Sequence, residues 1–328
     1  MAIKKPVIFS GMQATGEPIL GNYIGAIRNW VGLQGDYECL YCIVDLHSLT
    51  VRQDPEVLRA NARRVLALYI ACGLDPEKNI IYFQSHVPAH AELAWILNCF
   101  TYVGELNRMT QFKEKSGKNA DNINAGLYTY PVLMAADILL FDSDVVPVGK
   151  DQVQHVEMAQ DIAQAINFNY KKELLRVPQA MIQEEVAVIP GLDGRKMSKS
   201  YNNVIPLFEN EKQLRKLIMR IVTNSQGVEE IKDPDSSQIF HLYKLFATPA
   251  EQEALAGRYR KGGMGWGEAK EELFKVINRE LSPLRAKYEK IMAEPRELDE
   301  ILEAGTKKAR AIAAKTLKRL REAVGMDS

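Results

Sequence analysis

The chain has 328 residues, of which 46% are hydrophobic and 26% are charged, and its 42 basic side chains balance 42 acidic ones. This composition excludes a disordered chain and an overall basic nucleic-acid-binding protein, so any nucleic-acid site must be a local patch. The length suffices for one large and one smaller domain. Because the sequence contains no signal-peptide core and no apolar run of about 18 residues, we expect a soluble, cytoplasmic protein without a membrane span.

The N-terminal part of the chain alternates between strand and helix patterns. Apolar runs predict strands within 5–12, 38–50 and 79–86. The segments between them, 21–34 and 54–73, have helical periodicity. Asp54 and Pro55 are typical of an N-cap and a first helical position. This order predicts a parallel sheet with helices on both faces, which is a Rossmann-like α/β fold.

The alternation breaks after the third predicted strand. Residues 88–141 read as two helices around a polar loop, after which a strand pattern returns within 142–152 and an amphipathic helix follows. Beyond about residue 206 only helical periodicity remains, with helices expected at 210–222, 236–246, 249–259, 266–292 and 296–324. We therefore expect an α/β domain over 1–205 with a helical insertion at about 88–141, and an all-α domain over 206–328.

Cys39 and Cys42 form a Cys-x-x-Cys pattern that is typical of a metal or redox site. The stretch is strand-like, however, so residues three apart point to opposite faces. No second such pair completes a four-ligand set. We expect no metal held by protein ligands.

Two loops have the composition of a phosphate site. Gly11, Gly16 and Gly21 bracket the turn after the first strand, where Gln13, Thr15 and Asn22 add side-chain donors. Ligands bind beyond the carboxyl ends of parallel strands, and a helix N-terminus there attracts phosphate. The glycine spacing matches neither the dinucleotide motif nor the P-loop, so a tight turn without a ligand remains an alternative.

The second loop is "KMSKS" at 196–200, which brings Lys196 and Lys199 close together. A solvated surface turn is one interpretation of it. On a hinged loop, however, the two lysines could close on a triphosphate as charge moves onto the leaving group. The pairing of this loop with the glycine-bracketed turn favours a nucleotide triphosphate site.

"KMSKS", together with "ILGN" at 19–22, resembles the two signature motifs of class I aminoacyl-tRNA synthetases. Five longer segments resemble the bacterial tryptophanyl-tRNA synthetases over almost the whole chain: "FSGMQATGEPILGNYIGAIRNW", "YCIVDLHSLT", "GELNRMTQFKEKS", "YPVLMAADILL" and "VPVGKDQVQH". The resemblance implies a homodimeric ligase that uses ATP, Mg²⁺, L-tryptophan and tRNA(Trp). It also implies that the C-terminal helical domain binds the tRNA anticodon.

The resemblance also assigns nucleotide-site residues. It implies that catalysis involves Lys196, Lys199, Lys115, Gln13 and Asn22. It implies ATP contacts from Gln13, Ala14, Thr15, Gly21, Asn22, Gly149, Lys150, Asp151, Val188, Lys196, Met197, Ser198, Lys199 and Ser200. Mg²⁺ would be held mainly by the ATP phosphates.

The amino-acid site is expected around Asp137, which shares a predicted helix face with Tyr130 and Met134. A carboxylate buried among apolar residues needs a partner, and an indole N–H, which is purely a donor, would suit it. The resemblance implies the same role for Asp137. It implies further tryptophan contacts from Phe9, His47, Tyr130, Met134, Val146, Val148 and Gln152, although an isolated histidine is more often structural.

Three departures from the family pattern concern single contacts. Ile19 stands where Thr or His is usual, Lys150 stands where Glu is usual, and the first turn has "QAT" where a proline is common. Two alternatives remain open. A phenol also donates to a carboxylate, so a tyrosyl-type synthetase is possible, although the apolar surroundings of Asp137 favour indole. The second alternative is a non-catalytic paralogue that binds nucleotide or RNA. The intact "KMSKS" motif argues against it.

Overall fold

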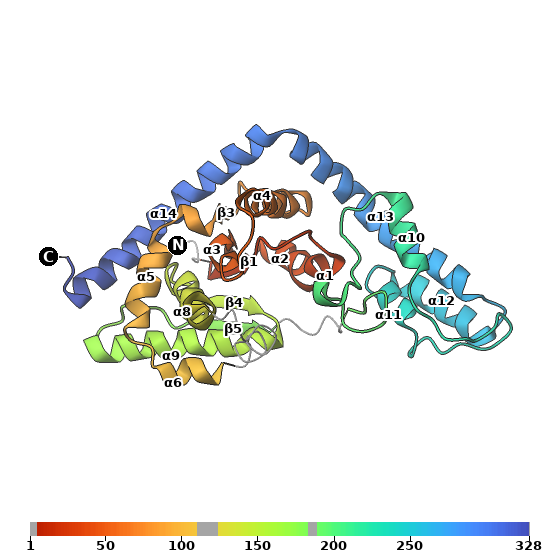
Figure 1. Ribbon diagram of the computed structural model, residues 1–328, viewed down its shortest axis with the longest axis horizontal. Coiled ribbons are helices and arrows are strands. Elements are labelled where there is room, and N and C mark those ends of the chain that lie inside the picture. Colours follow the sequence, from red (N-terminus) through yellow and green to blue (C-terminus); the bar gives the residue numbers. More distant parts are fainter. Residues whose placement is uncertain (1–4, 110–123, 183–188, 328) are drawn as a thin grey trace.

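The computed structural model describes residues 5–109, 124–182 and 189–327, arranged around one parallel sheet (Figure 1). Its strands are β1 (Val7–Met12), β2 (Glu38–Ile43), β3 (Ile80–Phe83), β4 (Val145–Val148) and β5 (Gln179–Ile182). Their order is β3-β2-β1-β4-β5, and every neighbouring pair is parallel. The predicted Rossmann-like α/β fold is confirmed. The strand order reverses between β1 and β4, so the ligand crevice should open at the carboxyl ends of these two strands.

The helix that follows the first turn is continuous but not uniform. It runs through α1 (Leu20–Asn22), a π-helical segment η1 (Tyr23–Ile27) and α2 (Arg28–Leu33). π-helical turns within helices are frequent at functional sites. The next helix, α4 (Pro55–Ala71), begins as predicted, because the Asp54 side chain accepts hydrogen bonds from the first free N–H groups of the helix.

The two faces of the sheet are covered by different helices. The helices that follow β2 and β3 on one side are short: α3 (Asp45–Ser48), η2 (Gln84–His86), α5 (Ala89–Asn98) and α6 (Val103–Arg108). α5 and α6 enclose one core together with α8 (Ala125–Leu139), α9 (Val153–Tyr170) and the second half of the last helix. α4, the helix after the first turn and the other C-terminal helical segments enclose the second core. Cys39 belongs to the second core and Cys42 to the first, which confirms that they point to opposite faces.

The C-terminal part of the chain is helical throughout. It begins with the turn η5 (Lys199–Tyr201), and then come α10 (Glu211–Met219), α11 (Gln238–Lys244), α12 (Pro249–Lys261), α13 (Trp266–Ala293) and α14 (Pro295–Val324). Figure 1 shows α14 running back from the end of α13 across β3 and α5. The last helix therefore packs on the α/β part of the molecule. The expected division of the chain into two domains at about residue 205 remains a prediction.

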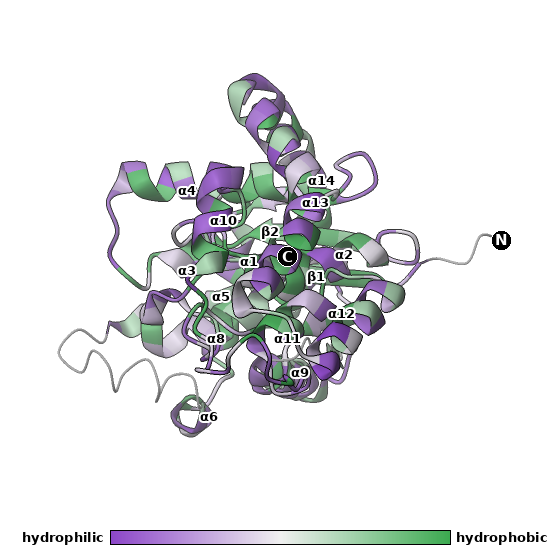
Figure 2. Cartoon of the chain, turned by 90° about the vertical axis from the view of Figure 1, so that its right-hand side faces the viewer, coloured by the Kyte–Doolittle hydropathy of each residue, from purple (hydrophilic) through white to green (hydrophobic). Residues whose placement is uncertain are grey.

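Hydrophobic residues gather in the strands and on the inward faces of the helices, as Figure 2 shows for β1 and β2. Strand β5 was not predicted, because its four residues "QAMI" carry no alternation and none of them is fully buried. Within the described residues no helix is both long and apolar enough to cross a membrane.

The crossing of α14 over β3 depends on Gly305. A methyl group at this position would overlap the carbonyl oxygen of Ile81, which is backbone and cannot rotate away. We expect Gly305→Ala to lower the thermal midpoint of unfolding and to cost about 2 kcal/mol, because overpacking forces the helix off the strand. The matched control is Gly257→Ala, where the added methyl in α12 meets open space and should leave stability unchanged or slightly higher. Equal midpoints for both variants would contradict the close packing.

Candidate active site

The predicted amino-acid site is a cavity of about 380 Å³ at the carboxyl ends of β1 and β4. It is lined by all eight residues that the resemblance assigned to tryptophan: Phe9, His47, Tyr130, Met134, Asp137, Val146, Val148 and Gln152. The side of this cavity next to β1 also includes Gly25, Ala26 and Trp30 from the π-helical segment and α2. The π-helix therefore lies against the candidate site.

A second cavity of about 360 Å³ adjoins the first, because Gly11 and Gln13 line both. Thr15, Gly16, Asn22 and Lys199 also line it, together with Met12, Pro18 and Val65. An apolar slot thus opens into a polar cradle at the end of β1. A larger cavity of about 770 Å³ lies at the opposite, amino ends of the strands and contains none of the motif residues.

Lys199 joins the two motifs. Its Nζ atom donates a hydrogen bond of 2.5 Å to the carbonyl oxygen of Thr15. Gly16 has a φ of +64°, and a methyl group there would lie 3.2 Å from this Nζ, so glycine serves both the turn and the approach of the lysine. Desolvation at the turn lowers the pKa of Lys199 below its ordinary value, which Glu17 partly opposes.

The rest of the "KMSKS" loop is held by Asn203, which is 2% exposed. The Asn203 side chain donates to Asp193 and to the Lys196 carbonyl, and it accepts from the Ser198 N–H. The Ser198 side chain in turn accepts from the Ser200 N–H. Sequence reasoning missed Asn203, although the Asn-Asn pair after the motif is a turn signal.

Not every predicted nucleotide-site residue lies at the turn. The Lys196 side chain lines neither cavity, and Met197 is buried beside Gly21. Gly149 lines the first cavity, and its neighbour Asp151 accepts a hydrogen bond from Gln152. Lys150 and Asp151 line neither of the two cavities, whereas Lys115 and Val188 fall outside the described residues.

Ile19 and Asn22 illustrate how the first motif tolerates its departure from the family pattern. The Asn22 side chain accepts from the Ile19 N–H at 3.0 Å and so closes the start of the helix. Ile19 itself is buried, with its apolar side chain in the core. Ala14, also buried, is fixed by a hydrogen bond from its N–H to the Ser48 hydroxyl at 3.1 Å. Asn22 thus lines the cradle while it holds the start of the helix.

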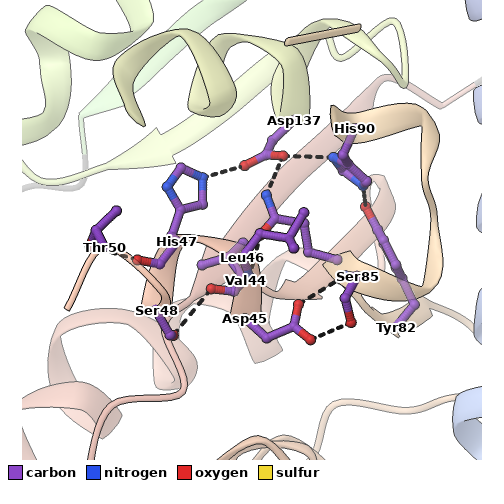
Figure 3. A network of polar contacts seen from close by, with 11 residues as sticks. Val44, Asp45, Leu46, His47, Ser48, Thr50, Tyr82, Ser85, His90 and Asp137 are labelled. Atoms are coloured by element: carbon purple, nitrogen blue, oxygen red, sulfur yellow. Dashed lines mark hydrogen bonds and ion pairs between the residues drawn. The ribbon is translucent and has the colours of Figure 1, made fainter. Parts of the chain in front are cut away.

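Asp137 is buried at 1% exposure, but its partners differ from the expectation. Its Oδ1 atom accepts hydrogen bonds of 2.6 Å from both Gln84 and His90, and its Oδ2 atom pairs with His47 at 2.8 Å (Figure 3). The expectation that Asp137 is buried among apolar residues without a protein partner is therefore wrong, because the protein supplies three partners, whereas its contact with an indole N–H stays a prediction. Sequence reasoning missed Gln84 and His90, which follow the third predicted strand as Asp45 and His47 follow the second.

The electrostatics of the Asp137 cluster favour a carboxylate. Burial raises the pKa of Asp137, but His90 and His47 lower it more through their electrostatic interaction and hydrogen bonds with the carboxylate, and the net pKa lies below its ordinary value. The site therefore combines an apolar slot, an ionised acceptor at its inner end and a cradle with an ammonium group. Such an arrangement suits a flat apolar ring that carries an N–H, placed next to a phosphate-bearing group.

Comparisons with known proteins agree with this chemistry. A family model described as class I tRNA synthetases for tryptophan and tyrosine matches residues 2–282. A curated tryptophan–tRNA ligase of Rhodopirellula baltica is 46% identical over 319 residues, covering 97% of this chain and 99% of the relative. One of Xanthomonas campestris is 46% identical over 329 residues, covering 97% and 76%.

Solved structures give the same result. A tryptophanyl-tRNA synthetase from Campylobacter jejuni, complexed with ADP and tryptophan, has a TM-score of 0.90 and 43% identity, with 97% of this chain and 99% of that chain covered. One from Mycoplasma pneumoniae has a TM-score of 0.84 and 31% identity, with 99% of both chains covered.

The lowered pKa of Asp137 makes stability depend on pH. Its ionised form contributes stability above the ordinary value of 3.8, and this contribution is lost as the pH falls through the lower value in the fold. We expect Asp137→Asn to cost about 3 kcal/mol at neutral pH, since it breaks a buried pair, and the cost to shrink on acidification. Thermal unfolding of both proteins from about pH 7 to about pH 3 measures this. A cost that stays constant would contradict the ionised carboxylate, and Asp161→Asn on the exposed face of α9 is the control.

Proposed function

The chain belongs to the family of class I tRNA synthetases for tryptophan and tyrosine and is a tryptophan–tRNA ligase, and we propose that its two joined cavities activate tryptophan with ATP. In this step the tryptophan carboxylate attacks the α-phosphorus of ATP in line and pyrophosphate leaves. The tryptophanyl group of the adenylate then passes to the 3′ end of tRNA(Trp), and AMP leaves. Positioning and charge stabilisation carry such a reaction, without a covalent intermediate on the enzyme.

The observation that carries this proposal is the adjacency of slot and cradle at Gly11 and Gln13. An indole in the slot would have its ring nitrogen at Asp137 and its carboxylate directed toward the cradle. Tyr130 and Gln152, at the side of the slot, would meet the α-amino group. The reacting atoms would then meet next to Lys199.

In the cradle, Gln13, Thr15 and Asn22 would hold the phosphates, while Lys199 would neutralise charge on the leaving pyrophosphate. Lys196 would join them only after the "KMSKS" loop moves. Gly149 and Asp151 would meet the ribose. The remaining roles that the resemblance implied, including those of Lys115 in catalysis and Val188 in ATP binding, stay predictions.

Mg²⁺ would add positive charge against the departing pyrophosphate. Among the described residues no group of three or more His, Cys, Asp or Glu side chains is placed to hold a metal ion. The resemblance implies that the ATP phosphates would be its main ligands.

The tRNA would contact the C-terminal helices, and α10–α13 are better suited to the anticodon than α14. Several basic residues of α14 are already occupied: Arg310 donates to the His86 carbonyl, Arg319 pairs with Asp142, and Arg321 pairs with Glu92. These contacts fasten α14 to the α/β part of the molecule. These three arginines of α14 thus have a structural use.

A homodimer would cover apolar side chains at the ends of α5 and α9. Trp95, Tyr102 and Phe168 are 71%, 76% and 83% exposed. The ends of the two helices meet, because the rings of Phe100 and Tyr170 lie 6.0 Å apart. Exposed aromatic clusters of this kind are typical of protein interfaces. Because the proposed function belongs to translation, we expect such a dimer in the cytoplasm.

The test of the function is ATP–pyrophosphate exchange with each of the twenty amino acids. We expect exchange with tryptophan to exceed exchange with phenylalanine by several orders of magnitude, because phenylalanine cannot make the buried polar bond. Exchange with tyrosine should also be slower than exchange with tryptophan. Equal or faster exchange with tyrosine would indicate a tyrosyl-type enzyme. Exchange with none of the amino acids would support the non-catalytic paralogue.

Lys199 tests the role of the cradle. We expect Lys199→Ala to slow tryptophan activation by about a hundredfold or more, because it removes the cation nearest the departing phosphates. Tryptophan binding, measured by calorimetry without ATP, should barely change, since Lys199 does not line the slot. The exposed Lys212 of α10 provides the control, Lys212→Ala. An unchanged exchange rate for Lys199→Ala would refute the proposed catalytic role.

A further inference from the structure

We propose that Gln84 and His90, together with Tyr82, are positioning residues that leave the Asp137 carboxylate a single open acceptor site, and that this restriction determines recognition of the indole N–H. The inference rests on the proposed function and extends it to residues behind the site. Gln84 and His90 are fully buried and do not line the slot, whereas Asp137 and His47 do. Any effect of Gln84 and His90 on the substrate must therefore pass through Asp137.

The open site follows from the number of donors on each oxygen. A carboxylate offers about four lone-pair positions, two on each oxygen. Oδ1 of Asp137 uses both of its positions, for Gln84 and His90, and Oδ2 uses one for His47. The remaining position is on Oδ2, the oxygen bonded to His47, which lines the slot itself.

The orientation of Gln84 is set by the backbone. The N–H of Leu46 donates to the Oε1 atom of Gln84 at 3.1 Å. The amide nitrogen must therefore face Asp137, and the side chain cannot flip without losing both bonds. Asp45 holds the same turn by accepting from the Ser85 N–H at 2.9 Å, which fixes η2 against α3.

Tyr82 has the corresponding role for His90. Its hydroxyl lies 3.1 Å from Nε2 of His90, and the rings stack at 5.8 Å (Figure 3). A phenol O–H that donates to Nε2 leaves the imidazole proton on Nδ1, where it is directed at Oδ1 of Asp137. Tyr82 is itself buried and on β3, so the chain from strand to carboxylate is rigid.

The consequence is a site that accepts one hydrogen bond and has no spare donor in this cluster. An indole N–H only donates, so it fits the one position on Oδ2. A phenol would donate to the same position, but its oxygen would also need a donor, and those of Gln84, His90 and His47 toward Asp137 are already used. A buried polar atom without a partner is disfavoured, which favours tryptophan over tyrosine.

The experiment compares L-tryptophan with β-(3-benzothienyl)-L-alanine, in which sulfur replaces the indole N–H. The ratio of their kcat/KM values in pyrophosphate exchange measures recognition of that N–H. We expect Gln84→Met to reduce this ratio about tenfold or more, because a donor to a charged acceptor is lost and Oδ1 is freed to bind water. KM for tryptophan should rise, while KM for the analogue and for ATP should stay close to wild type.

Tyr82→Phe gives a milder second variant, since it removes one hydroxyl and keeps the stacked ring. It should lower the same ratio by a smaller factor. Leu97→Val is the matched control, because Leu97 is a fully buried residue of α5, the helix that carries His90, and has no bond to the cluster. It should reduce the thermal midpoint but leave the ratio unchanged.

The outcomes separate the inference from the function it rests on. If the wild-type protein does not activate tryptophan, the proposed function fails and the inference fails with it. If the wild-type protein prefers tryptophan over the analogue, yet Gln84→Met and Tyr82→Phe impair both ligands equally, the residues only support the fold and the inference is overturned.

Discussion

The burial of one ionised carboxylate constrains much of this structure. Asp137 is a buried residue of α8, and a charge in such a place is tolerated only when hydrogen-bond donors surround it. Those donors come from segments far apart in the chain: His47 after β2, Gln84 after β3 and His90 on α5. Their convergence fixes how the helical insertion packs on the sheet. The same bonds that make the charge tolerable also decide what the charge can still bind.

The carboxylate is useful because of the strand order. With β1 between β2 and β4, the slot that contains Asp137 and the turn that follows β1 share Gly11 and Gln13. A ring bound in the slot is therefore held at a fixed distance from phosphates bound at the turn. In the proposed function, a buried acceptor in the slot would recognise the indole, and side-chain amides and one ammonium group in the cradle would hold the phosphates. The fold contributes their relative position, which is the main catalytic requirement of an in-line displacement at phosphorus.

Local and family signals in the sequence predicted much of this. Asp54 and Pro55 marked the start of α4 correctly, and the residues assigned to the tryptophan site line one cavity. Side-chain partners were harder to predict, because Gln84 and His90 acquire their roles only through long-range packing against Asp137. Rules of spacing within one helix or strand contain no information about such contacts. The polar residues that end β3 were nevertheless a signal, since the same pattern ends β2 at Asp45 and His47.

The "KMSKS" loop is held by more hydrogen bonds than its sequence suggested. Sequence composition suggested a flexible, hinged loop, but Asn203 ties together Asp193, the Lys196 carbonyl and the Ser198 N–H. A buried side chain with three such bonds holds the loop as one body. Movement of Lys196 toward the cradle must then displace the loop as a unit with the segments that pack on it. Because Lys199 already contacts the turn and Lys196 does not line the cradle, the two lysines of the motif differ: in the proposed function Lys199 is preorganised, whereas Lys196 would need the loop to close.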